Sequence, residues 1–337
     1  MKNSENNEKI TWGIIGAGDV CEKKSAPAMY KLPGSQVKSV MRRNGEKAKH
    51  FAGRHNIPYA YDDADRIFED PEIDIVYIAT PPSSHPELAI RAAKAGKPAY
   101  VEKPMAADYR GCEAMNNAFR EAGLPLFVAY YRRTLPNFLK IKELIDEGTI
   151  GEVRTVNIMM NKEAVPDNVR SLEYNWRVIP EIAGGGYFFD LASHQLDFLD
   201  FVFGPVKEAK GITTNQAGLY EAEDVVTASF SFESGVVGSG SWCFTAGKSA
   251  DIDRTTIVGS EGKIEYATFG DPIVNLYTDD RGKEEFHFEL PKHIQQNLIQ
   301  SILDEFKGKG TCPSTGISAA RTSLAMEMIV RWDNEVG

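Results

Sequence analysis

A short glycine loop near the N-terminus constrains this chain more than any other feature of its sequence. The apolar stretch Ile10–Ile15 runs directly into Gly16-Ala17-Gly18-Asp19-Val20-Cys21, which opens a helical pattern. In such a strand–loop–helix unit the first glycine makes the tight turn, and the second lets a pyrophosphate approach the backbone. Cys21 takes the third position, which usually holds Gly or Ala, and a thiol is only slightly larger than a methyl group. Since amides at a helix N-terminus bind phosphate, the loop predicts a Rossmann unit with dinucleotide contacts at Gly16, Ala17, Gly18, Asp19 and Val20.

The first part of the chain alternates strand and helix patterns. β-Branched and aromatic runs predict the strands, and apolar residues at helical spacing predict the helices. Alternation of this kind requires a parallel sheet with right-handed crossovers. A glycine-rich turn without a ligand is the alternative interpretation of the loop, but this context favours the nucleotide site. The expected strands are Ile10–Ile15, Val37–Met41, Ile75–Ile78, Ala99–Val101 and Leu126–Ala129, and the helices are Asp19–Lys31, Glu46–His55, Pro86–Ala95 and Tyr109–Ala122.

Residues at two strand ends refine the nucleotide site. The second strand ends in Arg42-Arg43, without the Asp or Glu that binds the ribose hydroxyls of NAD. Guanidinium groups suit a 2′-phosphate, so NADP is the preferred prediction and NAD the alternative; a solvated loop is the other interpretation of this pair. After Ile75–Ile78, Thr80 and Pro81 are expected to contact the cofactor, because open α/β sheets bind ligands at this edge. His85 is expected either to contact the nicotinamide ribose or to cap a helix.

Beyond residue 130 the pattern becomes strand-rich, with turn residues between the runs. The α/β Rossmann domain, residues 1–130, is therefore expected to be followed by an α+β domain with a largely antiparallel open sheet, residues 131–337. Few helices against many strands leave an apolar sheet face, which predicts a homodimer or homotetramer. The strands expected here are Val153–Asn161, Val206–Thr213, Asp224–Phe232, Val236–Phe244, Thr255–Val258, Lys263–Tyr266, Val274–Tyr277 and Glu285–Leu290, and the helices are Asn137–Glu147, Tyr187–Phe203, Gln295–Phe306 and Ser318–Val330.

Composition excludes several classes of protein. The 337 residues carry 38 Lys+Arg and 48 Asp+Glu, and the net charge of −10 argues against nucleic-acid binding. Cys21, Cys112, Cys243 and Cys312 are scattered, which predicts reduced thiols and no metal site. The N-terminus, Met1–Lys9, is polar, and no run of about 18 apolar residues occurs, so neither a signal peptide nor a membrane span is expected. A cytoplasmic enzyme or small-molecule-binding protein is predicted.

A charged triplet, Glu102-Lys103-Pro104, follows the strand Ala99–Val101, and charge at the end of a buried strand is costly unless it is paired or functional. Together with four other motifs, this triplet makes nearly the whole chain resemble the glucose–fructose oxidoreductase / inositol dehydrogenase family (Gfo/Idh/MocA). The other motifs are Gly16-Ala17-Gly18, Ala79-Thr80-Pro81, Gly184-Gly185-Gly186 and Asp190-Leu191-Ala192-Ser193-His194. The bond before the triplet's proline is often cis in that family, which the resemblance implies for Lys103–Pro104.

The resemblance also implies the catalytic residues Lys103, Asp190 and His194. An ammonium group at Lys103 would stabilise negative charge on the reacting oxygen; a structural pair with Glu102, or a solvated lysine, is the alternative. Asp190 and His194 lie four residues apart on one helix face, as suits a base and the carboxylate that orients it, or else a structural pair. Glu102 is expected beside the cofactor, and Asp197 is expected to have a structural partner.

Substrate contacts are expected from two aromatic–basic stretches. Tyr131-Arg132-Arg133 resembles the family's segment where the two domains join. Tyr131 and Arg132 are expected to donate hydrogen bonds to substrate hydroxyls, whereas Arg133 is as easily explained by a structural ion pair. Trp176 and Arg177 offer a flat aromatic face and a forked donor, which suit a polyol ring.

The function predicted from these residues is NAD(P)-dependent hydride transfer between nicotinamide and a secondary alcohol or ketone of a sugar, polyol or related compound. One alternative is a non-catalytic NAD(P)-binding regulator, since folds can keep a site without its chemistry. The presence of Lys103, Asp190 and His194 together weighs against it. A second alternative is a reductase of a dihydrodiol, an imine or a tetrapyrrole, because the sequence does not name the substrate.

Overall fold

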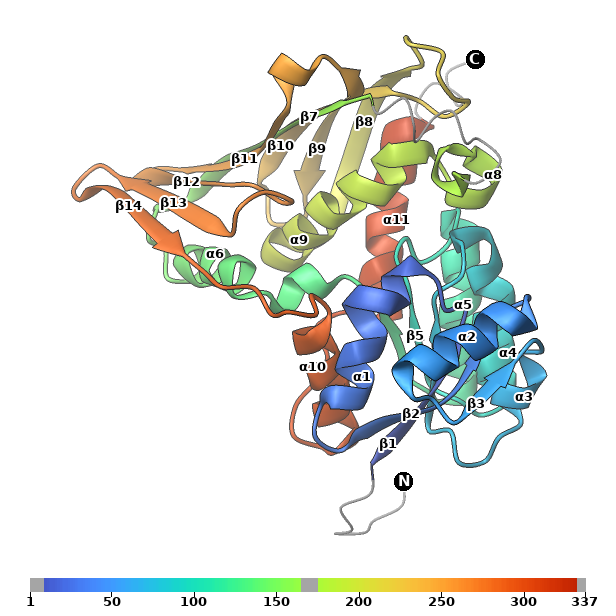
Figure 1. The fold of residues 1–337 in the computed structure, drawn as a ribbon. Helices are drawn as coiled ribbons and strands as arrows, with labels where there is room; N and C mark the ends of the chain where they lie inside the picture. The colour runs from blue at the N-terminus through green and yellow to red at the C-terminus, as the bar shows by residue number, and fades with distance from the viewer. Residues whose placement is uncertain (1–8, 165–174, 332–337) are drawn as a thin grey trace. The chain divides into compact units, whose positions relative to one another are not determined.

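A computed structural model describes residues 9–164 and 175–331, and the chain divides into two units (Figure 1). The first unit contains the chain up to Met105, Glu113–Tyr131 and Pro291–Gly316. The second contains Ala106–Cys112, Arg132–Leu290 and the chain from Ile317 onward. The expected division near residue 130 would make each domain one continuous segment. The two units are instead discontinuous, because Pro291–Gly316 belongs to the first unit and Ala106–Cys112 belongs to the second. Most of the N-terminal stretch Met1–Lys9 lies outside the described residues.

The first unit is built on a sheet of six parallel strands in the order β3-β2-β1-β4-β5-β6. Their bounds are β1 Ile10–Ile15, β2 Ser35–Met41, β3 Tyr59–Tyr61, β4 Ile75–Ile78, β5 Ala99–Val101 and β6 Leu126–Val128. The prediction of an α/β Rossmann domain is confirmed. Among the strands of this unit only β3 was missed, because its three partly exposed residues show too little apolar alternation. The short helix Asp65–Phe68 was also missed. The strand order reverses at β1 and β4, whose carboxyl ends therefore border the crevice where such sheets bind ligands.

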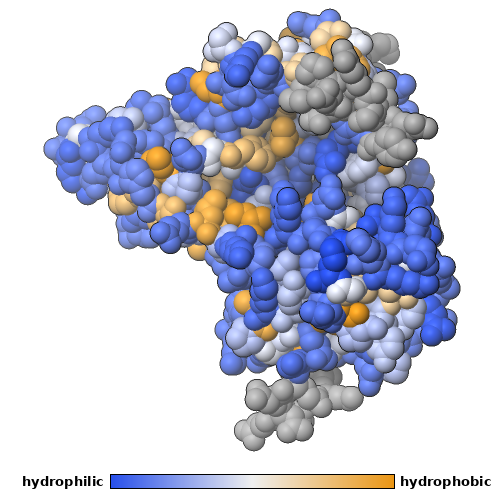
Figure 2. Space-filling view, viewed as in Figure 1, coloured by the Kyte–Doolittle hydropathy of each residue, from blue (hydrophilic) through white to orange (hydrophobic). Residues whose placement is uncertain are grey.

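Helices flank this sheet, and their ends follow local chemistry. Asn44 caps α2 by accepting a hydrogen bond from the Lys47 amide (3.0 Å), as expected for an asparagine at this position. Every residue of β4, β5 and β6 is buried, as in parallel sheets covered on both faces. The face of this unit seen in Figure 2 is mostly hydrophilic. The helices are α2 Gly45–His55, α3 Asp65–Phe68, η2 Pro82–Ser84, α4 His85–Lys94, α5 Tyr109–Ala122, of which residues 113–122 belong to this unit, and α10 Gln296–Phe306.

The helix after the glycine loop contains a π-helical turn, η1 Cys21–Ser25, before α1 Ala26–Lys31. Pro27 has no N–H to donate to the carbonyl of Lys23, four residues earlier. The Ala26 amide instead donates to the carbonyl of Cys21, five residues earlier. The freed carbonyl of Lys23 accepts a hydrogen bond from Nδ1 of His293 (2.9 Å). The predicted helix is therefore present, and it is widened where proline interrupts it.

The second unit is built on a sheet of eight strands in the order β14-β13-β12-β11-β7-β10-β9-β8. Only β7 and β10 pair in parallel, which confirms a largely antiparallel sheet. Two strands begin three residues earlier than expected. β11 begins at Ile252 and not at Thr255, and β14 begins at Gly282 and not at Glu285, because Gly282 pairs with Thr278 across a three-residue turn. The strands are β7 Val153–Glu163, β8 Val206–Thr214, β9 Val225–Phe232, β10 Val237–Ala246, β11 Ile252–Gly259, β12 Gly262–Tyr266, β13 Ile273–Thr278 and β14 Gly282–His287.

The two faces of this sheet differ in character. On the inner face, Phe138 of α6 packs edge-on against Phe198 of α9 (4.7 Å between ring centroids), and both contact Tyr266 of β12. Alternate residues on the opposite face are exposed, and most are small and uncharged: Asn157, Thr227, Ser229 and Ser239. The helices of this unit are α6 Pro136–Asp146, α8 Pro180–Ala183, α9 Ser193–Phe203 and α11 Gly316–Val330, with shorter turns η3 Tyr131–Thr134, η4 Trp176–Val178, η5 Phe188–Ala192 and η6 Lys248–Ala250.

Over residues 9–164 and 175–331, no helix combines the length and apolar character needed to cross a membrane. Within the same ranges, no three His, Cys, Asp or Glu side chains are grouped closely enough to hold a metal ion.

Candidate active site

The glycine loop has the shape that a pyrophosphate requires. Gly16 has a φ of +88°, and a Cβ atom there would lie 2.5 Å from Cγ2 and 2.8 Å from N of Thr80. A Cβ atom at Gly18 would meet only the carbonyl oxygen of Gly16, at 3.9 Å. The first glycine is therefore required by the fold, while the second leaves open space beside the backbone. This geometry fits a phosphate group that approaches the loop at Gly18.

Cys21 fills the third position of this loop as a buried, uncharged side chain. Burial, with the nearby carboxylate of Glu102, raises the pKa of the Cys21 thiol to about 12. The residue therefore stays a neutral thiol at physiological pH and brings no negative charge beside the phosphate loop. Its effect on the fold is that of a small apolar residue.

The end of β2 carries the predicted arginine pair. Arg42 is half-buried and its amide donates to the carbonyl of Tyr61 (3.1 Å), while Arg43 is exposed. A depression of about 420 Å³ begins at the next residue, Asn44, and is lined also by Gly45, Tyr61 and Asp62. It lies where a Rossmann unit binds the adenosine ribose. Arg42 and Arg43 thus directly precede this depression in the chain, and their contact with the cofactor stays a prediction.

The turn after β4 is held by internal hydrogen bonds. Oγ of Ser84 donates to Oγ1 of Thr80 (2.7 Å), next to Pro81. His85 is fully buried, and its Nε2 lies 2.7 Å from the carbonyl oxygen of Thr80, while Nδ1 lies 3.1 Å from that of Met105. Burial lowers the pKa of His85. Both ring nitrogens thus lie against main-chain carbonyls, a role that the sequence did not indicate, and no side chain of the described residues caps α4. The contact of His85 with the nicotinamide ribose stays a prediction.

Glu102 and Lys103 follow β5, and the bond between Lys103 and Pro104 is cis, as the resemblance implied. Lys103 is half-buried, whereas Glu102 is only 7% exposed. The Glu102 carboxylate accepts hydrogen bonds from the Tyr77 hydroxyl (2.6 Å), from Nε2 of Gln295 (2.7 Å) and from the Lys103 amide (3.2 Å). These hydrogen bonds hold the backbone at Lys103, and a contact of Glu102 with the cofactor stays a prediction.

Three consecutive glycines precede the helix that carries Asp190 and His194. A Cβ atom at Gly184 would lie 2.4 Å from the carbonyl oxygen of Ala107, and one at Gly186 would lie 2.5 Å from Cβ of Ala222. Both residues also have positive φ values. The chain therefore needs glycine at these positions to bring the π-helical turn η5 close to its neighbours.

The structure brings together three of the predicted site residues in the second unit. Asp190 lies in η5, and its Oδ2 is 3.4 Å from Nε of Arg177. The guanidinium of Arg177 lies 4.5 Å from the ring centroid of Trp176. His194, on the next turn, is buried, and its ring packs edge-on against Phe269 (5.7 Å). Lys103 belongs to the first unit, and Asp190 and His194 belong to the second.

Phe269 was not anticipated from the sequence, and Arg132 explains its position. Nε of Arg132 donates to the carbonyl of Thr268 (3.1 Å), and its guanidinium lies 4.3 Å from the Phe269 ring centroid. Arg132 is 5% exposed, so it supports the ring against which His194 packs and is not placed to donate freely to a substrate. Tyr131 is likewise buried, in the first unit. Phe269 lies in a connection between strands, where periodicity gives no signal.

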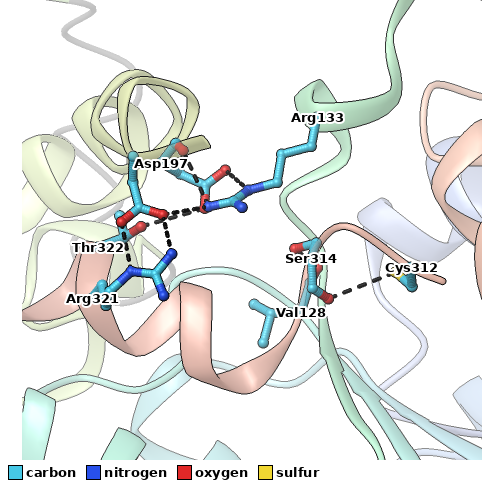
Figure 3. Close-up of polar contacts among 8 residues, drawn as sticks. Val128, Arg133, Asp197, Cys312, Ser314, Arg321 and Thr322 are labelled. Carbon is cyan, nitrogen blue, oxygen red and sulfur yellow. Dashed lines mark hydrogen bonds and ion pairs between the residues drawn. The ribbon is translucent and has the colours of Figure 1, made fainter. Parts of the chain in front are cut away.

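A buried charge cluster lies further along α9 (Figure 3). Arg133 forms a bidentate pair with Asp197 (2.9 and 2.8 Å) and contacts Asp200, which itself pairs with Arg321 (2.7 Å). Burial raises the pKa of Asp197 to about 6, and Arg133 opposes that rise. Burial opposes the charge of Arg133, but the two carboxylates raise its pKa. The structural partner expected for Asp197 is thus Arg133, and the alternative of a structural ion pair for Arg133 holds.

Two protein-family models together match most of the chain. Residues 10–130 match the oxidoreductase family with an NAD-binding Rossmann fold, and residues 138–265 match the GFO/IDH/MocA C-terminal domain. Oxidoreductase P35 of Formosa agariphila is 37% identical over 320 residues, which cover 95% of this chain and 98% of that protein.

More distant similarities are to proteins with named activities. Trans-1,2-dihydrobenzene-1,2-diol dehydrogenase of Bos taurus is 29% identical over 75% of this chain and 72% of its own length. A 1,5-anhydro-D-fructose reductase of Ensifer adhaerens is 28% identical, with 90% of each chain covered. The solved structure of levoglucosan dehydrogenase with NADH and levoglucosan shares the fold, with a TM-score of 0.86 at 23% identity over 97% of this chain and 98% of that one. The chain therefore belongs to the GFO/IDH/MocA family and is an oxidoreductase that binds NAD or NADP through its Rossmann unit.

Proposed function

We propose that this enzyme transfers a hydride between nicotinamide and a secondary alcohol or ketone carbon of a sugar, polyol or related compound. The observation that carries the proposal is the set of side chains at the start of α9. Asp190 pairs with Arg177, Arg177 stacks on Trp176, and His194 lies one turn further along. A base, a carboxylate, a forked donor and a flat aromatic face are together suited to a hydroxylated ring.

His194 accepts the hydroxyl proton when the substrate is oxidised and returns it when the substrate is reduced. Asp190 orients the imidazole, and Phe269, braced by Arg132, fixes the plane of its ring. Lys103 stabilises the negative charge that develops on the substrate oxygen. The bound nicotinamide nucleotide supplies or accepts the hydride. The residues of this chain contribute position, proton transfer and electrostatic stabilisation.

We further propose that NADP is preferred to NAD. Arg42 and Arg43 follow β2, where an NAD enzyme usually has an acidic residue, and the depression beginning at Asn44 adjoins them. Guanidinium groups can bind a 2′-phosphate with two hydrogen bonds each and keep their charge at any physiological pH.

Two substrate classes are favoured by particular relatives. The likeness to a 1,5-anhydro-D-fructose reductase, over nine-tenths of both chains, supports a sugar-derived ketone or alcohol. The likeness to a trans-1,2-dihydrobenzene-1,2-diol dehydrogenase, over a smaller part of the chain, supports a dihydrodiol as the second candidate.

The test is a substrate screen followed by the absorbance of the reduced nicotinamide. The purified protein is offered 1,5-anhydro-D-fructose, a panel of sugars and inositols, and trans-1,2-dihydrobenzene-1,2-diol, each with NADP(H) and with NAD(H). Turnover of a sugar or polyol is the expected result, and turnover of the dihydrodiol alone selects the second candidate. Tight cofactor binding without turnover of any compound in the panel contradicts both and favours a regulator.

A further inference from the structure

We propose that Gln295 is a positioning residue for Lys103, acting through the carboxylate of Glu102. Gln295 lies 192 positions after Lys103 in the sequence, in the late segment that returns to the first unit. The inference rests on the catalytic role proposed above for Lys103. It adds a residue that neither touches the substrate nor belongs to any of the motifs found in the sequence.

The Gln295 side chain is buried and fully engaged. Only 1% of the residue is exposed, and although Gln295 immediately precedes α10, its side chain does not cap that helix. Nε2 donates to Oε1 of Glu102 (2.7 Å), and Oε1 accepts from the hydroxyl of Tyr100 (2.8 Å). A carboxylate needs a donor and a hydroxyl needs an acceptor, so these two partners fix the orientation of the amide.

Glu102 connects the fixed amide of Gln295 to the backbone of Lys103. Its carboxylate receives hydrogen bonds from Tyr77, Gln295 and the Lys103 amide. Burial raises the pKa values of Tyr77 and Tyr100 well above the ordinary range, so both phenols remain donors. Their rings stack, with centroids 5.0 Å apart. A buried carboxylate with directional donors on several sides has one stable orientation, and that orientation holds the backbone from which Lys103 extends.

The backbone around Gln295 is anchored separately. The Gln295 amide donates to the carbonyl of Lys24 (3.4 Å), and Nδ1 of His293 donates to that of Lys23 (2.9 Å). Lys31 contacts Nε2 of His293 (3.0 Å). These contacts attach the segment to the helix that follows the phosphate loop, and none of them uses the Gln295 side chain. A substitution of the Gln295 side chain should therefore change the position of Lys103 and leave the glycine loop that binds the cofactor in place.

Two variants separate the proposed role from simple packing. Gln295→Met has a similar size but loses both hydrogen bonds. Gln295→Glu can still accept from Tyr100, but it can donate to Glu102 only while its own carboxyl is protonated. Small displacements of a catalytic group cost up to about 100-fold in rate, so Gln295→Met should lower kcat roughly 10- to 100-fold, and Gln295→Glu should lose kcat relative to the wild type as the pH rises and the new carboxyl ionises. The affinity for NADPH, titrated by fluorescence, should change by less than about twofold, because the Gly16–Gly18 loop is untouched.

Gln300→Met is the matched control, because Gln300 lies on α10, five residues after Gln295, and its side chain donates to Asp304 of the same helix (2.9 Å). It should leave kcat and NADPH affinity unchanged. In a Glu102→Gln background, Gln295→Met should have little further effect, because the two residues act as a unit. Wild-type kcat in Gln295→Met, or full additivity in the double variant, would overturn the proposal. If Gln295→Met does not fold, Gln295→Glu, which keeps the length of the side chain, still decides: a pH profile of kcat identical to that of the wild type would overturn the proposal.

Lys103→Ala distinguishes a failure here from a failure of the proposed function. Normal turnover in Lys103→Ala would contradict the catalytic role of Lys103. Loss of turnover in Lys103→Ala together with normal turnover in the Gln295 variants would contradict only the role proposed for Gln295.

A second measurement needs no substrate: the rate of reductive methylation of Lys103, measured by peptide mass spectrometry. Gln295→Met should change that rate and leave the rate at Lys94, an exposed lysine on α4, unchanged. An unchanged rate at Lys103 would count against the proposal even if no substrate is found.

Discussion

Single residues of this protein perform the proposed chemistry. Their substitution should lower kcat far more than it lowers the affinity for NADPH. Lys103→Ala and His194→Ala should each lower kcat about 10²–10⁴-fold, the usual contribution of positioned acid–base groups. Their tasks arise only as the substrate oxygen gains or loses its proton, so NADPH affinity should be nearly unchanged. Asp190→Asn should cost less, because it misorients the imidazole but leaves a base in place.

The assay for these variants is steady-state turnover with the substrate found in the screen, together with fluorescence titration of NADPH. Lys94→Ala, at an exposed position of α4, serves as the control and should behave as the wild type. Near-normal turnover in His194→Ala would rule out the proposed proton transfer and leave a mechanism based on Lys103.

The cofactor preference is also decided by single residues. Arg42→Asp should weaken the binding of NADPH more than that of NADH, because it replaces a donor to the 2′-phosphate with a like charge. Dissociation constants for both nucleotides, with Arg154→Asp at an exposed position near the start of β7 as the control, test this. The preference is wrong if the wild-type protein binds NADH about tenfold more tightly than NADPH, a difference of roughly 1.4 kcal/mol.

Motifs in the sequence mark the candidate site residues, but they do not show every contact that those residues make in the fold. Glycine loops and short charged motifs mark Gly16, Lys103 and Asp190, because backbone geometry and chemistry both restrict those positions. The sequence could not show that His85 binds main-chain carbonyls or that Arg132 supports Phe269. Those roles depend on which polar groups remain unsatisfied after folding, and such groups come from distant parts of the chain.

At the scale of elements, α9 is tied to its neighbours by buried charges. Asp197 is fully buried and forms the bidentate pair with Arg133, so Asp197→Ala should lower the free energy of unfolding by about 3 kcal/mol, because the buried Arg133 guanidinium keeps only Asp200, a carboxylate it shares with Arg321. Replacing both partners, Arg133→Met with Asp197→Leu, should cost less than the sum of the single changes.

Urea denaturation measures these differences. Asp251→Ala is the matched control: Asp251 forms an ion pair with Lys162 across exposed strand ends, and such pairs contribute about 0–1 kcal/mol. A loss of less than about 1 kcal/mol in Asp197→Ala would mean that the cluster does not hold α9 in place.

Most elements could be predicted from periodicity, and the exceptions have physical causes. β3 is too short to show a pattern, and the last strand was shifted because its turn is formed by Asp279–Arg281. The π-helical turns at Cys21–Ser25 and Phe188–Ala192 keep the apolar spacing of a helix, so the sequence shows a helix in both places. The contact of Gln295 with Glu102 had no sequence signal, because nothing local links residues so far apart.

At the scale of the whole molecule, the exposed sheet face predicts self-association. Most residues on that face in β7, β9 and β10 are small and uncharged, and Met159 and Val237 add exposed apolar side chains. Oγ of Ser239 donates to Oδ1 of Asn157 across the strands (2.8 Å). A flat surface of this kind suits burial against a second copy through two-fold symmetry. We therefore expect a homodimer or homotetramer.

Light scattering tests this expectation. Ser239→Lys places a charge in the centre of the face and should dissociate the assembly, whereas Ala114→Lys, at an exposed position of α5, should not. A monomeric wild-type protein at micromolar concentration would refute association through this sheet.

The divided first unit has a consequence for biosynthesis. Its edge strand β6 is closed by the late segment: the Val128 amide donates to the carbonyl of Ser314 (3.2 Å), and Oγ of Ser314 donates to the carbonyl of Val128 (2.7 Å; Figure 3). A ribosome adding about 5–20 residues per second needs roughly 10–40 s to pass from Tyr131 to Gly316. During that interval the strand lacks its neighbour, and unpaired edges promote aggregation. A nascent chain released before Ser314 is made would therefore carry a nucleotide-binding unit whose edge strand β6 lacks these hydrogen bonds.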